Sequence, residues 1–292
     1  MNKLFQTSYV IITPVRDEEE YIERTIHAVL LQTIKPIEWV IVNDGSTDNT
    51  GRIIDEYAGQ YQWIHAIHRQ NRGFRKAGGG VIETFYDGYN ALNCKNWRFI
   101  VKLDGDLSFS ADYFEKCFAS FVNNPKLGIG GGTVYHNING MQKPEKQPLF
   151  HVRGATKIYR KECWENISGL IKAPGWDTLD EVKANMLGWE TKSFSELKVI
   201  HHRYTGEADC TWRNLRKNGM ANYISGYHPL FMLLKCLKRV FYKPYFIGSI
   251  VLFYGFISGY INSIPQVDDR LLINYLRQQQ LRKLFFMKSI WE

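Results

Sequence analysis

Short β-rich runs alternate with segments of helical period over the first 130 residues of this 292-residue chain. This alternation is typical of βα units, which build a mainly parallel sheet with helices on its faces. In such a sheet, ligands lie beyond the carboxyl ends of the strands. We therefore expect an α/β fold whose site is built from the loops that follow the strands. We expect strands at residues 9–13, 38–42, 63–67 and 98–103, and helices at 18–32, 50–58 and 80–92.

A different pattern begins near residue 127. The glycines of residues 128–132 run into a β pattern instead of opening a helix, which excludes the fingerprint of a dinucleotide-binding loop. We expect strands at 128–135, 151–159 and 190–201, a polar loop at 137–148, and helices at 161–167 and 174–188.

Composition places the chain among folded proteins. With 45% hydrophobic and 23% charged residues, it has the apolar surface that disordered chains lack. Its five cysteines are odd in number and widely spaced, and no Cys-x-x-Cys pair occurs, so neither a disulfide framework nor a zinc site is indicated. The N-terminus lacks the long apolar stretch of a secretory signal. These features predict a cytoplasmic protein.

The net charge of +8 is confined to the C-terminal end. Residues 201–292 hold 13 Lys+Arg against 5 Asp+Glu, whereas residues 1–200 hold 24 of each. Residues 244–267 carry no formal charge and, as one helix, would span about 36 Å, more than the roughly 30 Å hydrocarbon core of a bilayer. Basic residues beside an apolar run favour contact of residues 229–292 with the cytoplasmic face of a membrane, more at the interface than across it. A buried helical hairpin is the alternative, and nucleic acid is not an expected partner.

Two aspartates leave a predicted strand together. Asp104 and Asp106 flank Gly105 directly after the apolar run at residues 98–103. Paired carboxylates suit Mg²⁺ or Mn²⁺, and these ions suit a nucleotide diphosphate. A solvated turn is the alternative for so short a motif.

A third aspartate, Asp44, follows another β-branched strand and precedes a Gly-Ser turn. Its carboxylate can accept the N–H of a uracil or guanine base, so we expect it to face the ligand. Ser46 and Asp48 lie just before the next predicted helix, where capping alone can explain them.

Five short motifs follow one another along the chain. They are Pro14-Val15-Arg16-Asp17-Glu18, Asn43-Asp44-Gly45-Ser46-Thr47-Asp48-Asn49-Thr50, Asn71-Arg72-Gly73, Asp104-Gly105-Asp106 and Trp176-Asp177. In this order and spacing, which covers roughly residues 7–205, the chain resembles the inverting glycosyltransferases of family 2, which have the GT-A fold. The resemblance implies a catalytic domain at 1–205, with a nucleotide-sugar half at about 1–107 and an acceptor half at about 108–205. A basic and apolar helical region would follow at 206–292.

The resemblance also implies roles for single residues. Asp177 is expected to be the base that deprotonates the acceptor hydroxyl, with a helix cap as its alternative role. Trp176 stands before it where relatives have Glu, and Asn43 replaces the first acid of the second motif. Asp104 and Asp106 are expected to hold a divalent metal, Mn²⁺ or Mg²⁺. The expected donor-binding residues are Pro14, Arg16, Glu18, Asp44, Asn71, Lys76 and Asp104.

Further candidates lie beyond the last motif. His201 and His202 end a predicted strand, where adjacent side chains point to opposite faces, so at most one of them can bind the metal, and both can equally be polar residues at a strand end. The further candidates are Asp180 and Glu181 as alternative bases, His202 as a metal ligand, and Arg213 and Arg216 as phosphate contacts.

These observations together predict a glycosyltransferase. It would transfer a sugar, with inversion, from a UDP-, GDP- or dTDP-sugar to a saccharide or lipid-linked acceptor in polysaccharide or glycolipid synthesis. A catalytically silent sugar-nucleotide-binding or scaffold protein of the same fold is the alternative. A nucleotidyltransferase is disfavoured, because the acidic loop at residues 15–18 would repel a triphosphate.

Overall fold

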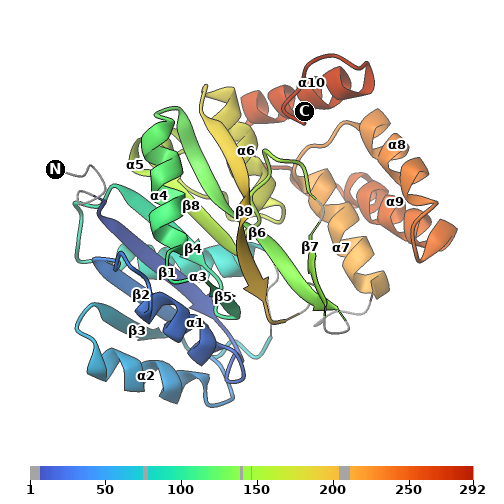
Figure 1. Ribbon diagram of the computed structural model, residues 1–292. Helices are drawn as coiled ribbons and strands as arrows, with labels where there is room; N and C mark the ends of the chain where they lie inside the picture. Colours follow the sequence, from blue (N-terminus) through green and yellow to red (C-terminus); the bar gives the residue numbers. More distant parts are fainter. Residues whose placement is uncertain (1–6, 75–77, 139–140, 146, 204–210, 292) are drawn as a thin grey trace.

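The computed structural model describes residues 7–74, 78–138, 141–145, 147–203 and 211–291. It confirms the α/β prediction, with a sheet flanked by helices and a group of helices at the C-terminal end (Figure 1). The described strands are β1 (Tyr9–Val15), β2 (Glu38–Asn43), β3 (Ile64–His68), β4 (Phe99–Leu103), β5 (Leu107–Phe109), β6 (Leu127–Ile138), β7 (Met141–Pro144), β8 (Thr156–Arg160) and β9 (Glu190–His201). The described helices are α1 (Ile22–Leu30), α2 (Thr50–Gln60), α3 (Gly79–Asn90), α4 (Tyr113–Asn123), α5 (Lys161–Ile167), α6 (Trp176–Met186), α7 (Thr211–Ile224), α8 (Pro229–Arg239), α9 (Tyr245–Ile261) and α10 (Arg270–Leu284).

One sheet joins both expected halves of the domain. Its strand order is β3-β2-β1-β4-β8-β6-β9-β5, and β7 pairs with β6. The first four strands are parallel, so the loops that follow them emerge at the same edge. Strand β8 is antiparallel to β4, and its first residue, Thr156, lies opposite Leu103 at the end of β4. The start of β8 therefore reaches the edge at which the parallel strands end.

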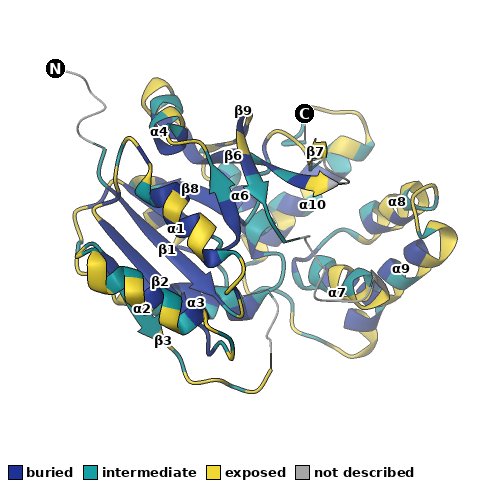
Figure 2. Ribbon diagram, turned by 60° about the horizontal axis from the view of Figure 1, so that its bottom comes forward, coloured by how far each residue is buried: buried dark blue, intermediate teal, exposed yellow. Residues whose placement is uncertain are grey.

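The two faces of the sheet are covered by different helices. Alternate residues of β1 show this division: Tyr9 and Ile11 pack with α1, α2 and α4, whereas Val10 and Ile12 pack with α3, α5 and α6. Because both faces are covered, β1, β2 and β4 are buried along their whole length. Figure 2 shows this burial for β1 and β2. Such burial explains why these strands are continuous apolar runs in the sequence.

Two expectations for the second half are wrong in detail. The segment at 137–148 was expected to be a polar loop, but it contains β7, which pairs antiparallel with β6. All four residues of β7 are exposed, so the strand has no apolar alternation by which to recognise it. The strand expected at 151–159 begins only at Thr156.

The apolar C-terminal segment forms a shorter helix than expected. Helix α9 has 17 residues, about 26 Å, and ends at Ile261 instead of continuing to Val267. Ser263 then has a left-handed φ of 49°, and Pro265 restricts the residue before it, so the helical path is broken. Within the described residues, no helix combines the length and apolar character needed to cross a membrane.

Helix α10 joins the C-terminal helices to α6. Leu272 and Leu276 of α10 form a buried cluster with Leu179 and Val182 of α6, beside which α10 lies in Figure 1. Asp269, which caps α10, also lies 3.2 Å from the Lys183 ammonium group. The helix that begins at Trp176 and Asp177 is therefore packed between the sheet and the C-terminal end of the chain.

Candidate active site at the carboxyl edge of the sheet

The loops after β1, β2 and β4 touch one another at the edge of the sheet. The Asp44 amide donates to the Val15 carbonyl oxygen over 2.8 Å. At Gly105, an added Cβ would lie only 2.5 Å from Cγ1 of Val15, so glycine permits the turn between Asp104 and Asp106 to approach β1. The structure thus brings the motifs that contain Asp44 and Asp104 to one place.

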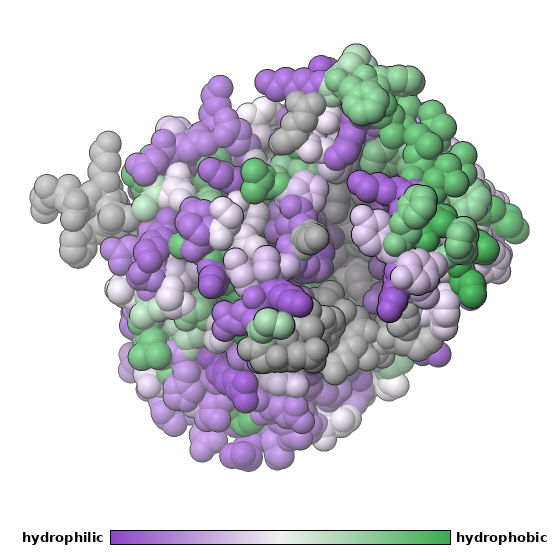
Figure 3. Space-filling model, turned by 45° about the vertical axis from the view of Figure 1, so that its right-hand side comes forward, coloured by the Kyte–Doolittle hydropathy of each residue, from purple (hydrophilic) through white to green (hydrophobic). Residues whose placement is uncertain are grey.

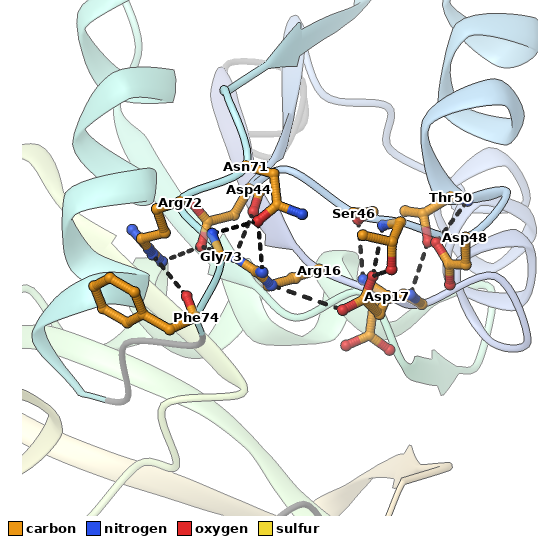
Figure 4. Close-up of polar contacts among 12 residues, drawn as sticks. Arg16, Asp17, Asp44, Ser46, Asp48, Thr50, Asn71, Arg72, Gly73 and Phe74 are labelled. Carbon is orange, nitrogen blue, oxygen red and sulfur yellow. Dashed lines mark hydrogen bonds and ion pairs between the residues drawn. The ribbon is translucent and has the colours of Figure 1, made fainter.

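Asp44 is held in a cluster of arginines (Figure 4). Its Oδ1 accepts a hydrogen bond from Arg69 over 2.7 Å, its Oδ2 accepts one from Arg72, and its carbonyl oxygen accepts one from Arg16 over 3.0 Å. The residue is only 8% exposed. A carboxylate has about four acceptor positions, so these two side-chain contacts leave capacity for the N–H of a base.

The loops after β1 and β2 are joined by further hydrogen bonds (Figure 4). Asp17 adopts a left-handed φ of 52°, a region in which Asp and Asn are the common non-glycine residues. Its Oδ1 accepts the Thr47 amide over 2.8 Å, and its own amide donates to Ser46 over 3.0 Å. Asp48 accepts the amides of Glu19 and Thr50. Ser46 and Asp48 therefore hold the loops together, whereas the cap residue of α2 is Asn49, whose side chain makes no capping hydrogen bond.

Arg16 and Asn71 connect these loops to the third motif. The Asn71 Oδ1 accepts hydrogen bonds from Arg16 over 3.1 Å and from the Gly73 amide over 2.8 Å. Glu18 is 8% exposed, and its carboxylate lies 2.8 Å from Arg203, two residues after the end of β9. Pro14 is a buried residue of β1 opposite Val42, and Lys76 lies outside the described residues.

The two carboxylates of the Asp104-Gly105-Asp106 turn have different partners. Oδ1 of Asp104 accepts a hydrogen bond from Lys102, whose ammonium group also donates to the Gly154 carbonyl over 2.7 Å. Burial raises the pKa of Asp104, the Lys102 ammonium opposes that shift, and the Asp106 carboxylate adds to it, so the net shift is upward. The Asp104 carboxylate is therefore paired with Lys102 through one oxygen, with a second carboxylate, that of Asp106, nearby.

Asp106 is 5% exposed and faces a histidine. Its Oδ2 lies 3.0 Å from Nε2 of His201, whose ring is 5.2 Å from that of His136. Burial lowers the pKa of His201, but the hydrogen bond and charge of Asp106 outweigh this effect and raise it. The other oxygen of Asp106, Oδ1, is buried without a hydrogen-bond partner in the described part of the chain.

The histidine beside the acidic turn is not the one expected from the sequence. His202 lies 2.9 Å from the Ser108 hydroxyl and 3.3 Å from Arg24, whereas His201 faces Asp106. The two residues are adjacent, His201 is the last residue of β9, and their rings contact different partners. Among the described residues, no three His, Cys, Asp or Glu side chains form a ready-made metal site. A divalent ion here would need oxygen atoms from its ligand in addition to Asp104, Asp106 and His201.

Asp177 lies in the first turn of α6. The cap residue of this helix is Gly175, with a φ of 83°, and no side chain caps the helix, so the alternative role of Asp177 as the helix cap is excluded. The Trp176 ring lies 5.5 Å from the ammonium groups of both Lys102 and Lys157. Lys102 also binds Asp104, so this one lysine contacts both the Trp176–Asp177 motif and the Asp104-Gly105-Asp106 turn.

Asp180 and Glu181, the alternative bases, are buried residues of α6. Both side chains are 0% exposed and lie 2.8 Å from the Lys157 ammonium group, which also donates to the Asp177 carbonyl. Asp180 accepts a hydrogen bond from Tyr159 as well, and burial raises its pKa to about 6. Glu181 accepts the Val152 amide over 2.7 Å. These contacts leave Asp177, which is partly exposed, as the accessible acid of this segment.

The two arginines expected at the phosphates lie on α7. Arg213 is exposed, and the guanidinium group of Arg216 lies 5.4 Å from the centre of the Tyr254 ring in α9. In the described contacts Arg216 therefore engages α9.

Several residues of the site escaped the sequence analysis. Lys102 and Lys157 are lysines inside buried strands and lie directly opposite each other in the β4–β8 pair. A charged residue within an apolar strand was the available signal, because such residues are rarely buried without a partner. The other missed residues are Arg69 and Arg203.

Comparison with known proteins gives the family of the chain. The profile described as glycosyl transferase family 2 matches residues 10–173. Glycosyltransferase GlyA of Streptococcus pneumoniae is 27% identical over 166 residues, which is 56% of this chain and 21% of GlyA. Chondroitin synthase of Pasteurella multocida is 30% identical over 129 residues, 44% of this chain and 12% of the synthase. The chain thus spans about a fifth or less of the length of these two relatives.

Solved structures share the fold. The mannosyltransferase PcManGT of Pyrobaculum calidifontis, solved with GDP-Man and Mn²⁺, aligns with a TM-score of 0.55 at 12% identity. The alignment covers 96% of this chain and 76% of PcManGT. The profile match covers more than half of the chain, and the sheet and the order of the motifs agree with it. The chain belongs to glycosyl transferase family 2.

Proposed function

We propose that the chain transfers a sugar from a nucleotide-diphospho-sugar to a hydroxyl group of a saccharide or lipid-linked acceptor, with inversion at the anomeric carbon. The observation that carries this proposal is the convergence of four segments at one edge of the sheet. These are the loops after β1, β2 and β4 and the start of α6. A donor that lies across this edge would have Asp44 beside its base and Asp104 and Asp106 beside its diphosphate. Asp177 would lie on the side of the acceptor.

The donor is proposed to lie along the carboxyl edge of β1, β2 and β4. Asp44 accepts an N–H of the base, and the arginines around it fix the carboxylate in position. Arg16 and Asn71 hold the neighbouring loops. Lys76, three residues beyond the Asn71-Arg72-Gly73 motif, is proposed to bind the phosphates of the donor. Glu18 is proposed to act through its contact with Arg203. Pro14, inside β1, shapes the loop that follows it.

Asp104 and Asp106 are proposed to hold Mn²⁺ or Mg²⁺. Three features fit such an ion: two hard oxygen donors, the buried Oδ1 of Asp106 without a partner in the described chain, and the nearby His201 imidazole. PcManGT was solved with Mn²⁺. A bound divalent ion would supply positive charge to the departing diphosphate.

Asp177 is proposed to be the general base. It takes the proton of the acceptor hydroxyl while the oxygen forms a bond to the anomeric carbon from the face opposite the diphosphate. The bond from that carbon to the diphosphate oxygen breaks in the same step, and its electron pair leaves with the nucleotide. General-base assistance of this kind is typically worth about 10² to 10⁴-fold in rate.

The polymer or lipid that receives the sugar is proposed from the relatives. Chondroitin synthase is named for the synthesis of a polysaccharide. We place this chain in polysaccharide or glycolipid synthesis, acting at the cytoplasmic side of the membrane. The catalytic domain is proposed to comprise residues 1–205, and residues 206–292 form the helical region.

The test combines UDP-, GDP- and dTDP-sugars with the full chain in Mn²⁺ and in EDTA. Release of the nucleoside diphosphate is measured by chromatography, and the configuration of the transferred or hydrolysed sugar is read by proton NMR. The proposal expects release from one donor class, dependence on Mn²⁺, and an inverted product. Donor binding without release from every class would instead favour a silent sugar-nucleotide-binding protein.

A further inference from the structure

Helix α9 buries mostly small residues, together with Leu252 and Phe256, and most of its other large apolar residues are exposed. Its glycines lie where the helix packs against α7. An added Cβ at Gly255 would lie 2.2 Å from the Arg216 carbonyl oxygen, and one at Gly259 would lie 2.1 Å from the Tyr223 ring. The two helices therefore approach so closely that these two positions have no room for a side chain. A helix that only covered a protein core would expose a polar face, whereas the outer face of α9 carries large apolar side chains such as Phe246 and Ile250.

The outer face of α9 is a continuous apolar surface with the neighbouring turn and α8. Phe246 is 69% exposed, Ile250 is 65% exposed, and Phe241, in the turn between the helices, is 80% exposed. Figure 3 shows hydrophobic side chains gathered on this side of the molecule. We call this surface the α8–α9 face, and its apolar residues are Leu230, Leu233, Leu234, Leu237, Phe241, Tyr242, Tyr245, Phe246, Ile247, Ile250, Tyr254 and Ile261. Exposed apolar patches of this extent usually mark an interaction site.

The chain segment that forms α7, α8 and α9 carries charge of a single sign. Residues 211–267 contain seven Lys or Arg residues and no Asp or Glu. Lys235, Lys238 and Lys243 are exposed on α8 and the turn that follows it, among the apolar side chains. A polyanionic surface with an apolar interior matches both features, since anionic lipid headgroups attract lysine and the acyl region accepts the apolar groups.

We propose that the α8–α9 face docks on the surface of a lipid bilayer that contains anionic lipids. Helix α9 lies in the interface, with Phe246 and Ile250 inserted at the boundary between headgroups and acyl chains. A second copy of the chain fits this face poorly, because a two-fold interface would place the same basic residues against each other. This inference concerns attachment and does not depend on the proposed sugar transfer.

The test is flotation of the full chain with vesicles. Phosphatidylcholine vesicles are compared with vesicles that also contain phosphatidylglycerol, at low and high salt. The chain should float with the anionic vesicles at low salt, and high salt should release most of it. The variant F246S/I250S should bind at least tenfold more weakly, because two inserted apolar side chains are lost. The variant K238E/K243E should lose the preference for anionic vesicles.

The matched control is L31S/L187S. It replaces two exposed leucines, Leu31 at the end of α1 and Leu187 at the end of α6, which are distant in sequence from the α8–α9 face. It should float like the wild type. Melting temperatures of all variants check that they fold, as expected for changes at exposed positions. The proposal is wrong if the full chain stays at the bottom of the gradient at low salt, if F246S/I250S floats as well as the wild type, or if light scattering shows a dimer that this variant abolishes.

Discussion

Replacement of Lys157 by methionine tests the buried charge cluster that positions the start of α6. The Lys157 ammonium group lies 2.8 Å from both Asp180 and Glu181, and all three side chains are 0% exposed. It also donates to the carbonyl oxygen of Asp177, the proposed base. Methionine keeps much of the length of lysine but removes the charge, so two buried carboxylates lose their cation.

The expected loss of unfolding free energy is large. Removing one partner of a buried ion pair typically costs about 3 to 5 kcal/mol, because the remaining charge stays buried without compensation. Here the loss should depend on pH. Burial already raises the pKa of Asp180 to about 6, despite the opposing charge of Lys157. Without that charge the pKa should rise further, so the pair becomes easier to protonate.

The sign of the pH effect follows from this upward shift. A carboxyl whose pKa is higher in the folded state than in the unfolded state stabilises the fold below its unfolded pKa, and that contribution is lost as pH rises through the folded pKa. In the wild type the Asp180 contribution is therefore lost between about pH 4 and pH 6. In Lys157→Met the window extends to higher pH, so the variant should lose more stability at pH 8 than at pH 5.

Urea unfolding at pH 5 and pH 8 measures both effects. Lys192→Met is the matched control, because Lys192 is an exposed lysine of β9 and its replacement should change stability by less than about 0.5 kcal/mol. Adding Asp180→Asn to Lys157→Met should recover part of the loss at pH 8, since one buried charge is removed. A loss below about 1 kcal/mol at pH 8, or an equal loss at both pH values, would refute the reasoning.

Three other predictions concern the donor site and the C-terminal helices. Asp44→Ala should weaken binding of free nucleotide and sugar nucleotide alike by tenfold or more, since hydrogen bonds to charged groups are worth roughly 1.5 to 3 kcal/mol; unchanged calorimetric affinities would contradict the contact with the base. Asp106→Ala should remove the gain in donor affinity that Mn²⁺ gives the wild type, and equal wild-type affinity in Mn²⁺ and EDTA would end the metal hypothesis. Gly255→Ala should destabilise the chain by about 1 to 3 kcal/mol, because the added methyl group clashes with the Arg216 carbonyl. The control Gly59→Ala lies at an exposed helix position with open space and should stabilise the chain by about 0.5 to 1 kcal/mol. A melting temperature that moves the same way in both variants would contradict this packing.

The parallel half of the sheet was predictable because its strands are buried on both faces. Each such strand is a continuous apolar run that ends abruptly at polar residues, and β1, β2 and β4 all have this form. The polar residues at those ends, Asp44 and Asp104 among them, meet because parallel strands share a carboxyl edge. Local sequence therefore indicated both the fold class and the position of the loops that we propose bind the donor.

The second half of the sheet depends on pairings that local sequence does not encode. Strand β7 is fully exposed and gains its structure from β6 alone. The contact between Lys157 and α6 arises only when β8 pairs with β4 and α6 packs on that face. The choice between His201 and His202 depends on where β9 ends and which way each side chain turns, which spacing in the sequence does not fix.

The choice of the buried face of α9 also depends on contacts that local sequence does not encode. Its sequence is apolar all round, so periodicity does not reveal which residues face inward. The close approach of α7 requires glycine at positions 255 and 259, and most large residues other than Leu252 and Phe256 are left outside. Helix α9 is shorter than the uncharged run at residues 244–267. Residues 262–267 also lack charge, but they contain Ser263 and Pro265, which prevent the helix from continuing.

The central claim is that Asp177 is the base of a sugar-transfer reaction on a bound nucleotide-diphospho-sugar. The most direct measurement compares Asp177→Asn with the wild type in two assays, calorimetric donor affinity with Mn²⁺ and the rate of sugar transfer. Asn has nearly the same shape but cannot take a proton, and Asp268→Asn, at an exposed position, serves as the control. We predict unchanged donor affinity and melting temperature, with transfer reduced by roughly 10² to 10⁴-fold. Transfer by Asp177→Asn at a rate near that of the wild type would contradict the account.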